Sequence, residues 1–143
     1  MTLTTDQIAG VKATLENYRA AYQKKDFRAL VAAFAPDATG FGSGADEVFS
    51  SRKEYGPLLK RDLEQASSVV VEFQGMQIFG DGRVAWVTTG CSAAFTIPGI
   101  GKQVMQGRMT IVLRDTGKKW LIEQWHFSVP NIAQEPGQSF SNT

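Results

Sequence analysis

The spacing of hydrophobic residues along the chain changes near residue 67. Before this point, apolar residues recur every three or four positions, as on one face of a helix. Beyond it, apolar and polar residues alternate, as in strands. The pattern predicts helices over residues 5–23, 27–34 and 51–65, and long strands over residues 69–79, 84–97, 103–114 and 119–130. Three helices followed by a run of strands predict an α+β fold, with the helices packed on one face of the sheet.

Short turns separate the four predicted strands. Asp81-Gly82 and Asp115-Thr116-Gly117-Lys118 each supply a glycine of the kind that tight hairpins use, and Pro98-Gly99 begins the turn between them. Strands joined in this way form an antiparallel meander. We expect this sheet to curve strongly over the helices and to leave a cone-shaped, apolar cavity, which is the default ligand site of such a domain.

The last hairpin determines which side chains we expect in this cavity. Pairing Arg114 with Lys119 places Arg108 on the same face as Glu123 and leaves His126 on the opposite face. The first face combines these two charged residues with aromatic groups, a composition typical of a lined pocket. The residues predicted to contact a ligand are Tyr22, Phe41, Trp86, Thr88, Thr110, Trp125 and Phe127.

Composition narrows the classes of function. The chain has 143 residues, of which 43% are hydrophobic and 20% charged, and we interpret it as one domain, with an ordered core over about 5–130 and a loose tail over 131–143. The net charge of +1 gives no reason to expect nucleic acid or an anionic membrane as a partner. Without a signal-peptide pattern or an apolar run of about 18 residues, we expect a cytoplasmic protein.

Several stretches, taken in order, resemble the SnoaL-like branch of the nuclear transport factor 2-like superfamily. They are residues 25–34, 36–39, 42–48, 84–87 and 107–113, with Trp120 and residues 125–130. The resemblance spans nearly the whole chain and implies the cone-shaped fold, also called cystatin-like, and a homodimer formed through the outer face of the sheet. Two relatives within the superfamily bear on function: ketosteroid isomerase and the association domain of calcium/calmodulin-dependent protein kinase II.

Compared residue by residue, the chain retains little of either relative's site. Tyr18 stands where the isomerase has its oxyanion-hole tyrosine, but Gly42 stands where the general-base aspartate is expected. Thr110 replaces the second acid, and a threonine cannot act as a protonated carboxylic acid does. The arginines of the kinase pocket correspond to Thr88, Thr110 and Phe127. The resemblance therefore implies neither steroid isomerisation nor a preference for anionic ligands.

Three residues are candidates for catalysis. Arg108 would hold an anionic or carbonyl oxygen while Glu123 moves a proton, unless the two form a buried structural ion pair. Tyr18 would donate a hydrogen bond to a ligand oxygen, unless its hydroxyl pairs with a neighbour in the core.

Other reactive residues carry weaker expectations. Asp46-Glu47 would supply acid and base groups or cation ligands at the cavity mouth, or belong to a solvated loop. His126 is the only histidine, so we expect no metal, and Cys91 should be buried and inert. We expect no cofactor.

Three functions remain open. The first is a small-molecule-binding domain that takes a compact, partly aromatic or alicyclic ligand, either apolar or partly polar. The second is an enzyme of the isomerase, cyclase or hydratase type that uses Tyr18 with Glu123 or Arg108 for proton transfer. The third is a dimerising association module. An enzyme requires an acid inside the cavity with a raised pKa and space beside it, a binding domain requires only the space, and an association module requires neither.

Overall fold

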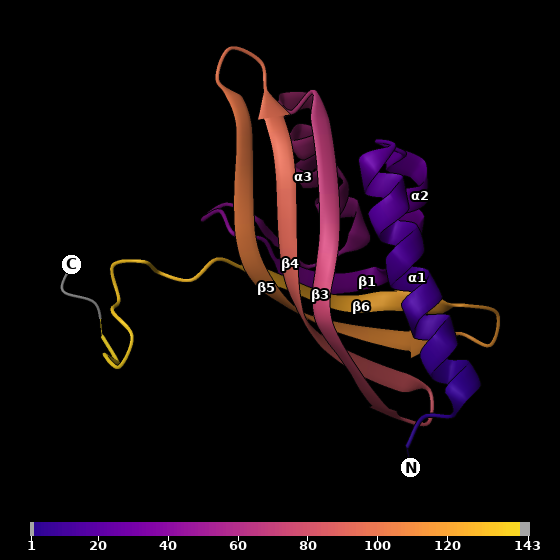
Figure 1. Ribbon diagram of the computed structural model, residues 1–143. Coiled ribbons are helices and arrows are strands. Elements are labelled where there is room, and N and C mark those ends of the chain that lie inside the picture. Colours follow the sequence, from indigo (N-terminus) through magenta and orange to yellow (C-terminus); the bar gives the residue numbers. More distant parts are fainter. Residues whose placement is uncertain (1, 141–143) are drawn as a thin grey trace.

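The computed structural model describes residues 2–140 and confirms the predicted α+β fold (Figure 1). Its elements are α1 (Thr5–Gln23), α2 (Phe27–Ala32), β1 (Phe34–Phe41), β2 (Val48–Phe49), α3 (Arg52–Gln65), β3 (Ser68–Asp81), β4 (Val84–Ile97), β5 (Gly101–Asp115) and β6 (Trp120–Ser128). The strands form one curved sheet in the order β2-β1-β6-β5-β4-β3. Within residues 2–140, no helix is long and apolar enough to cross a membrane.

Each long helix begins at a side-chain cap. The Thr4 hydroxyl accepts a hydrogen bond from the Gln7 amide at 3.1 Å, and the Gln7 side chain accepts one from the Thr4 amide at 2.8 Å. These reciprocal bonds satisfy two amides that the start of α1 would otherwise leave unpaired. The Ser51 hydroxyl caps α3 in the same way, by accepting from the Glu54 amide at 3.1 Å. Both helices therefore begin within a residue of their predicted starts.

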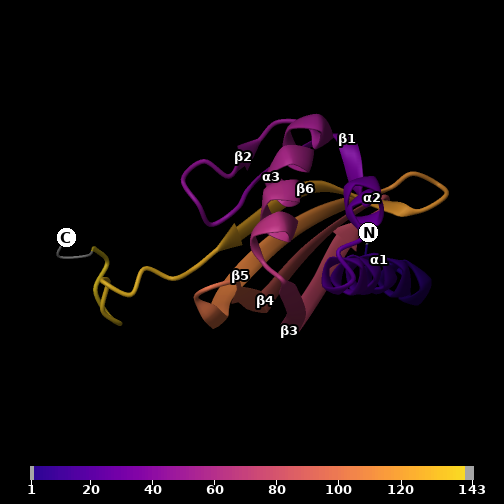
Figure 2. The ribbon, with the colours of Figure 1, turned by 90° about the horizontal axis from the view of Figure 1, so that it is seen from above.

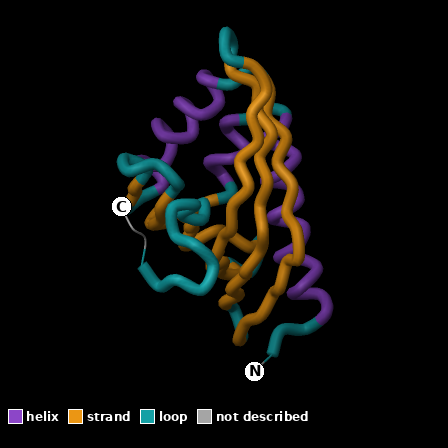
Figure 3. Tube along the Cα trace, turned by 60° about the vertical axis from the view of Figure 1, so that its left-hand side comes forward, coloured by secondary structure: helices purple, strands orange, loops and turns teal. Residues whose placement is uncertain are grey.

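The helices lie on one side of the long strands, which pass in front of them in Figure 3. Seen from above, α1 lies beside β3, and α3 lies near β1 and β2 (Figure 2). Strands β3 to β6 form the predicted antiparallel meander, and β1 extends it by pairing with β6 in parallel. Helix α2 ends at Ala32, two residues earlier than predicted, because Phe34 pairs with Ile122 in the sheet and Pro36 disfavours a helical residue before it.

A cluster of aromatic rings joins the helices to the sheet. Phe34 is fully buried, and its ring centroid lies 4.2 Å from that of Tyr55, 5.5 Å from that of Trp125 and 5.9 Å from that of Tyr18. Aromatic pairs at these distances stabilise a core beyond the effect of burying their area. The cluster therefore fixes α1, α3, β1 and β6 relative to one another.

The predicted register of the last hairpin is wrong in two respects: Arg114 pairs with Leu121 rather than Lys119, and β6 contains a β-bulge. Leu113 pairs with Ile122, but the next residue of β5, Val112, pairs with Gln124. Glu123 is the extra residue, and it reverses the alternation of side chains along the rest of β6. Beyond the bulge, Trp125 pairs with Ile111 on the helix side of the sheet. This reversal changes which residues of β5 share a face with the aromatic residues of β6.

Candidate functional site

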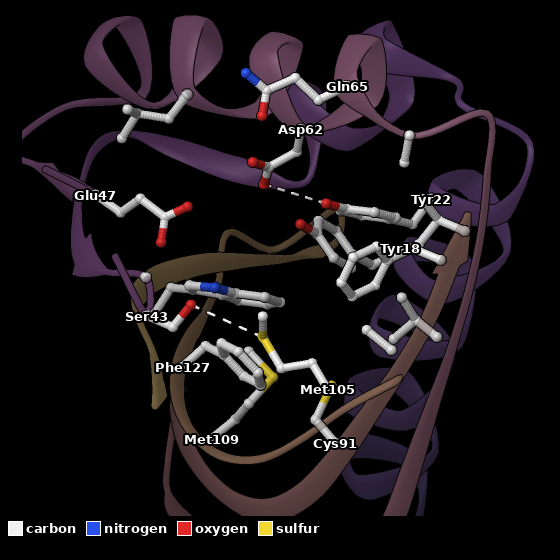
Figure 4. A pocket seen from close by; sticks show the side chains of 18 of the residues that line it. Tyr18, Tyr22, Ser43, Glu47, Asp62, Gln65, Cys91, Met105, Met109 and Phe127 are labelled. Atoms are coloured by element: carbon white, nitrogen blue, oxygen red, sulfur yellow. Dashed lines mark hydrogen bonds between the residues drawn. The ribbon is translucent and has the colours of Figure 1, made fainter. Parts of the chain in front are cut away.

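A pocket of about 340 Å³ lies between α1, α3 and the concave face of the sheet (Figure 4). Its wall combines aromatic rings, aliphatic and sulfur-containing side chains, and a few polar groups. The lining residues are Tyr18, Tyr22, Gly42, Ser43, Glu47, Phe49, Tyr55, Leu58, Asp62, Gln65, Ala66, Val69, Val71, Phe73, Cys91, Ala93, Phe95, Ile97, Met105, Met109, Trp125 and Phe127.

Helix α1 supplies two tyrosines to the pocket. Tyr18 and Tyr22 are one helical turn apart, so both point to the same side, and their ring centroids are 6.0 Å apart. The Tyr18 hydroxyl forms a hydrogen bond of 2.6 Å with the hydroxyl of Tyr55 on α3. Burial is the main cause that raises the pKa of both tyrosines, so both hydroxyls stay protonated. This pair is a neutral hydrogen-bonding group at the border of the pocket.

Asp62 is the acid of the pocket. The Tyr22 hydroxyl donates a hydrogen bond to Asp62 Oδ2 at 3.2 Å, which joins α1 to α3. Burial, and secondly the negative charge of Glu47, raise the pKa of Asp62 to about 6, against the opposing effects of the Tyr22 hydrogen bond and Arg61. A carboxyl group with this pKa can both accept and donate a proton near neutral pH.

Asp62 was not among the predicted site residues, although the pattern of α3 indicates it. Tyr55, Leu59 and Leu63 are buried along one side of α3. Asp62 lies two helical turns after Tyr55, so it falls beside this apolar stripe rather than on the solvated side. A single acid on the apolar side of an amphipathic helix is a marker of a buried functional group.

Glu47 is the second carboxylate of the pocket and comes from the loop between β1 and β2. The Gly42 amide donates to the Glu47 carbonyl at 2.8 Å, and the Gly44 amide donates to the Glu47 side chain. A Cβ at Gly42 would lie 2.6 Å from Glu47 Oε2, so a larger residue would displace the carboxylate. Of the predicted pair, Glu47 borders the pocket, whereas the exposed Asp46 binds Arg61 at 2.6 Å. Among the described residues, no group of His, Cys, Asp and Glu could hold a metal ion.

The wall opposite these acids is apolar. Figure 4 shows Met105, Met109, Cys91 and Phe127 across the pocket from Asp62 and Glu47. Cys91 is buried, as predicted, but it faces the pocket, and burial raises the pKa of its thiol to about 11. The thiol therefore stays neutral. Methionine side chains adapt to the shape of a ligand more readily than branched ones do.

The structure brings four of the predicted site residues together. Tyr18, Tyr22, Trp125 and Phe127 all line the pocket. Tyr18 also matches the alternative expectation that its hydroxyl pairs with a neighbour. The catalytic and binding roles of these residues remain predictions.

Five other predicted positions lie on the outer face of the sheet, so their expected placement in the cavity is wrong. Trp86 and Thr88 pair with Val112 and Thr110 as predicted, but this row turns away from the helices. The predicted register of β6 placed these residues on the same face as Trp125 and Phe127, and the bulge puts them on opposite faces. The misplaced residues are Phe41, Trp86, Thr88, Arg108 and Thr110, which are all exposed.

The predicted pair of Arg108 and Glu123 does not form. Arg108 donates to Ser128 Oγ at 3.4 Å, whereas Glu123 pairs with Arg114 at 3.2 Å. Arg108 borders a second hollow of about 430 Å³ on the outer face, together with Thr88, Thr110 and His126. His126 lies outside the pocket, as predicted. It shares the outer face with Arg108, however, because the bulge reverses the side-chain alternation of β6.

Solved structures of other proteins have the same fold as this chain. A provisionally assigned scytalone dehydratase from Novosphingobium aromaticivorans superposes with a TM-score of 0.81 at 11% identity, covering 87% of this chain and 85% of that one. A provisionally assigned dehydratase of the nuclear transport factor 2-like family from Streptomyces avermitilis gives 0.83 at 16% identity, covering 90% and 99%. These identities are low, so each likeness shows a shared fold.

A third structure represents the association-domain relatives. A provisionally assigned calcium/calmodulin-dependent protein kinase II association domain from Xanthomonas campestris gives a TM-score of 0.73 at 22% identity, covering 85% of this chain and 86% of that one. No curated protein matches the chain. The profile of the SnoaL-like domain matches residues 11–132, which is most of the sequence. The chain therefore belongs to the SnoaL-like domain family.

Proposed function

We propose that this protein binds a compact, mostly apolar small molecule in the pocket between α1, α3 and the sheet. The observation that carries the proposal is the space of about 340 Å³ that the core leaves open beside a buried tyrosine pair and two carboxylates. Ligand pockets of folded domains have volumes of about 300–1,000 Å³, with mostly apolar walls and a few polar groups that orient the ligand. The pocket has this composition and is at the small end of the range.

A pair of neighbouring alanines in β4 provides the test. Ala93 lines the pocket, whereas Ala94 pairs with Val70 and Val104 on the outer face. We choose 2-naphthol as the probe because it is compact, aromatic and carries one hydroxyl. It should bind saturably to the unmodified protein and to Ala94→Phe, and at least about tenfold more weakly to Ala93→Phe, whose ring fills the pocket. Equal binding to both variants, or no binding to the unmodified protein, would contradict the proposal.

Asp62 favours a second candidate function, an enzyme that transfers protons. A carboxylate beside an apolar space, with a pKa of about 6, can remove a proton from a carbon next to a ligand carbonyl and return it elsewhere. The tyrosine pair can donate a hydrogen bond to the oxygen on which negative charge develops. Isomerases and dehydratases both use this step. The fold shared with two provisionally assigned dehydratases supports this candidate without deciding it.

Proton exchange measures this step without knowledge of the natural substrate. In D₂O, an enolisable aromatic ketone such as 2-tetralone loses a carbon-bound proton to the base and receives a deuteron in return, which proton NMR follows. We expect the unmodified protein and Glu64→Gln, an exposed change on the same helix, to accelerate exchange above the background. Asp62→Asn should reduce the acceleration by about a hundredfold or more. Bound ketone that exchanges at the background rate would leave a binding domain without catalysis.

A further inference from the structure

The charged groups of the pocket wall all have the same sign. Glu47 and Asp62 are its two carboxylates, and none of the lining residues within the described chain is lysine, arginine or histidine. A wall of this kind repels an anionic ligand and accepts a hydrogen-bond donor. Building on the proposed function, we propose that the pocket is selective for ligand charge: it takes neutral hydroxyl compounds and protonated amines and rejects carboxylates and phosphates.

The nearby cations are already engaged elsewhere. Arg61 forms a two-pronged contact with Asp46 on the exposed side of α3, and also lies 3.6 Å from Glu47. The Lys25 ammonium donates to the carbonyl oxygens of Leu63 and Ala66, where it satisfies the C-terminal end of α3. Neither side chain lines the pocket.

The tyrosine hydroxyls of the pocket are largely engaged with one another and with Asp62. Of the three tyrosine hydroxyls, that of Tyr22 donates to Asp62, and one hydrogen lies between Tyr18 and Tyr55. One hydroxyl hydrogen is then left for a ligand. The other side-chain N–H donors of the wall are the Gln65 amide and the Trp125 indole, which are neutral as well. Neutral donors do not balance the charge of an anion that loses its hydration on entering an apolar pocket, and the two carboxylates add repulsion.

A hydrogen-bond donor on the ligand, by contrast, finds a free acceptor in the Asp62 carboxylate. Asp62 Oδ2 accepts from Tyr22, and within residues 2–140 Oδ1 receives no hydrogen bond. In Figure 4, the Asp62 carboxylate points from α3 into the pocket, near Glu47. A hydroxyl or ammonium group placed here makes a charge-assisted hydrogen bond, and an ammonium also separates the two negative charges. The rings of Tyr18, Tyr22 and Trp125 around the space favour the same positive charge.

Three probes that share one naphthalene ring test the selectivity: neutral 2-naphthol, anionic 2-naphthoate and the cationic 2-naphthylmethylammonium. At near-neutral pH and low salt, we expect the alcohol and the ammonium to bind at least about tenfold more tightly than the carboxylate. Carboxylate binding equal to or tighter than that of the alcohol would overturn the inference and leave the proposed function intact. If none of the three binds, the proposed function itself fails.

Charge-removing variants show whether the two acids set the preference. Asp62→Asn and Glu47→Gln each keep the shape of the side chain and should each reduce the ratio of ammonium to carboxylate affinity by about tenfold. Glu64→Gln, on the exposed side of α3, should leave the ratio unchanged. Thermal melts of each variant establish that it is folded, and the second acid provides an independent test if one variant is not. An unchanged ratio in both folded variants would overturn the inference.

Discussion

The hydroxyl of Tyr22 on α1 donates a hydrogen bond to the carboxylate of Asp62 on α3, in the wall of an apolar pocket. Two helices that are far apart in sequence thus meet through one polar contact, and the acid in this contact has a raised pKa. Most of the expected behaviour of the protein depends on this acid and on the space beside it.

The charge of Asp62 should lower the stability of the fold at neutral pH. The folded carboxyl has a pKa of about 6, against 3.8 without the fold, so the folded state holds its proton more tightly. The free energy of unfolding therefore falls as the pH rises from about 4 to 6 and stays lower above this range. Asp62→Asn removes this loss. Allowing for solvent screening of the partly exposed group, we expect the variant to be more stable by about 1–2 kcal/mol at pH 7.

Urea unfolding of both proteins at several pH values measures this difference. The gain from Asp62→Asn should be present at pH 7 and disappear below about pH 3, because Asp62 is then protonated in both the folded and the unfolded state. The groups that act on Asp62 and must be the same in both proteins are Tyr22, Tyr55, Asp46, Glu47 and Arg61. A variant less stable than the unmodified protein at pH 7 would show that the hydrogen bond from Tyr22 outweighs the cost of burial.

The buried hydroxyl pair should behave as one unit. Tyr18 and Tyr55 are 3% and 7% exposed, and each hydroxyl is the other's partner. Tyr55→Phe leaves the Tyr18 hydroxyl buried with its bond broken, which should cost about 1–3 kcal/mol of stability. The double change to phenylalanine should cost less than the sum of the two single changes, because no hydroxyl then lacks a partner. Additive costs in denaturant unfolding would show that the two hydroxyls do not depend on each other.

Because of the bulge in β6, we expect changes at Glu123 and Arg108 to leave ligand binding in the pocket unaffected. Glu123 pairs with Arg114, and Arg108 lies on the outer face, so neither side chain borders the pocket. Glu123→Gln and Arg108→Met should each leave the affinity for 2-naphthol within about twofold of the unmodified protein. The comparison is a calorimetric titration of each variant. A loss of about tenfold in either variant would indicate that the probe binds at the outer hollow.

The predicted homodimer is tested on the outer face of the sheet. Phe79 and Trp86 are paired neighbours there, and they are 56% and 48% exposed. If this face is the interface, Trp86→Glu should convert a dimer into a monomer, because it buries an unpaired charge between apolar surfaces. Ile100→Glu, at the exposed tip of the β4–β5 hairpin, is the control. Light scattering gives the masses, and a dimer that persists in Trp86→Glu would place the interface elsewhere.

The sequence allowed the elements to be predicted well, because periodicity and turn residues report on local structure. Strand β4 has its predicted bounds, and the pairing of Trp86 with Val112 followed from the turn that precedes β5. The bulge at Glu123 could not be predicted in this way. The bulge leaves one residue unpaired, and the local sequence Ile122-Glu123-Gln124 contains no glycine or proline that would mark it, so its position depends on the packing of the finished sheet.

The candidate site could be predicted only in part for the same reason. Tyr18 and Tyr22 lie on a helix whose apolar stripe is readable, and both were placed correctly. Arg108 was assigned through the strand pairing beyond the bulge, where the register differs from the predicted one by an odd number of residues, so Arg108 lies on the opposite face from Trp125. Asp62 acts with Tyr22 from a different helix, and this contact depends on how α1 and α3 pack.

The most direct test of a ligand site at Asp62 is a crystal structure of the protein with 2-naphthol bound. We expect the naphthalene ring between the aromatic residues of the pocket and the methionines of β5, with its hydroxyl within hydrogen-bonding distance of the Asp62 carboxylate. Density for the probe in the hollow beside Arg108, or a pocket that stays empty at saturating probe, would contradict this account.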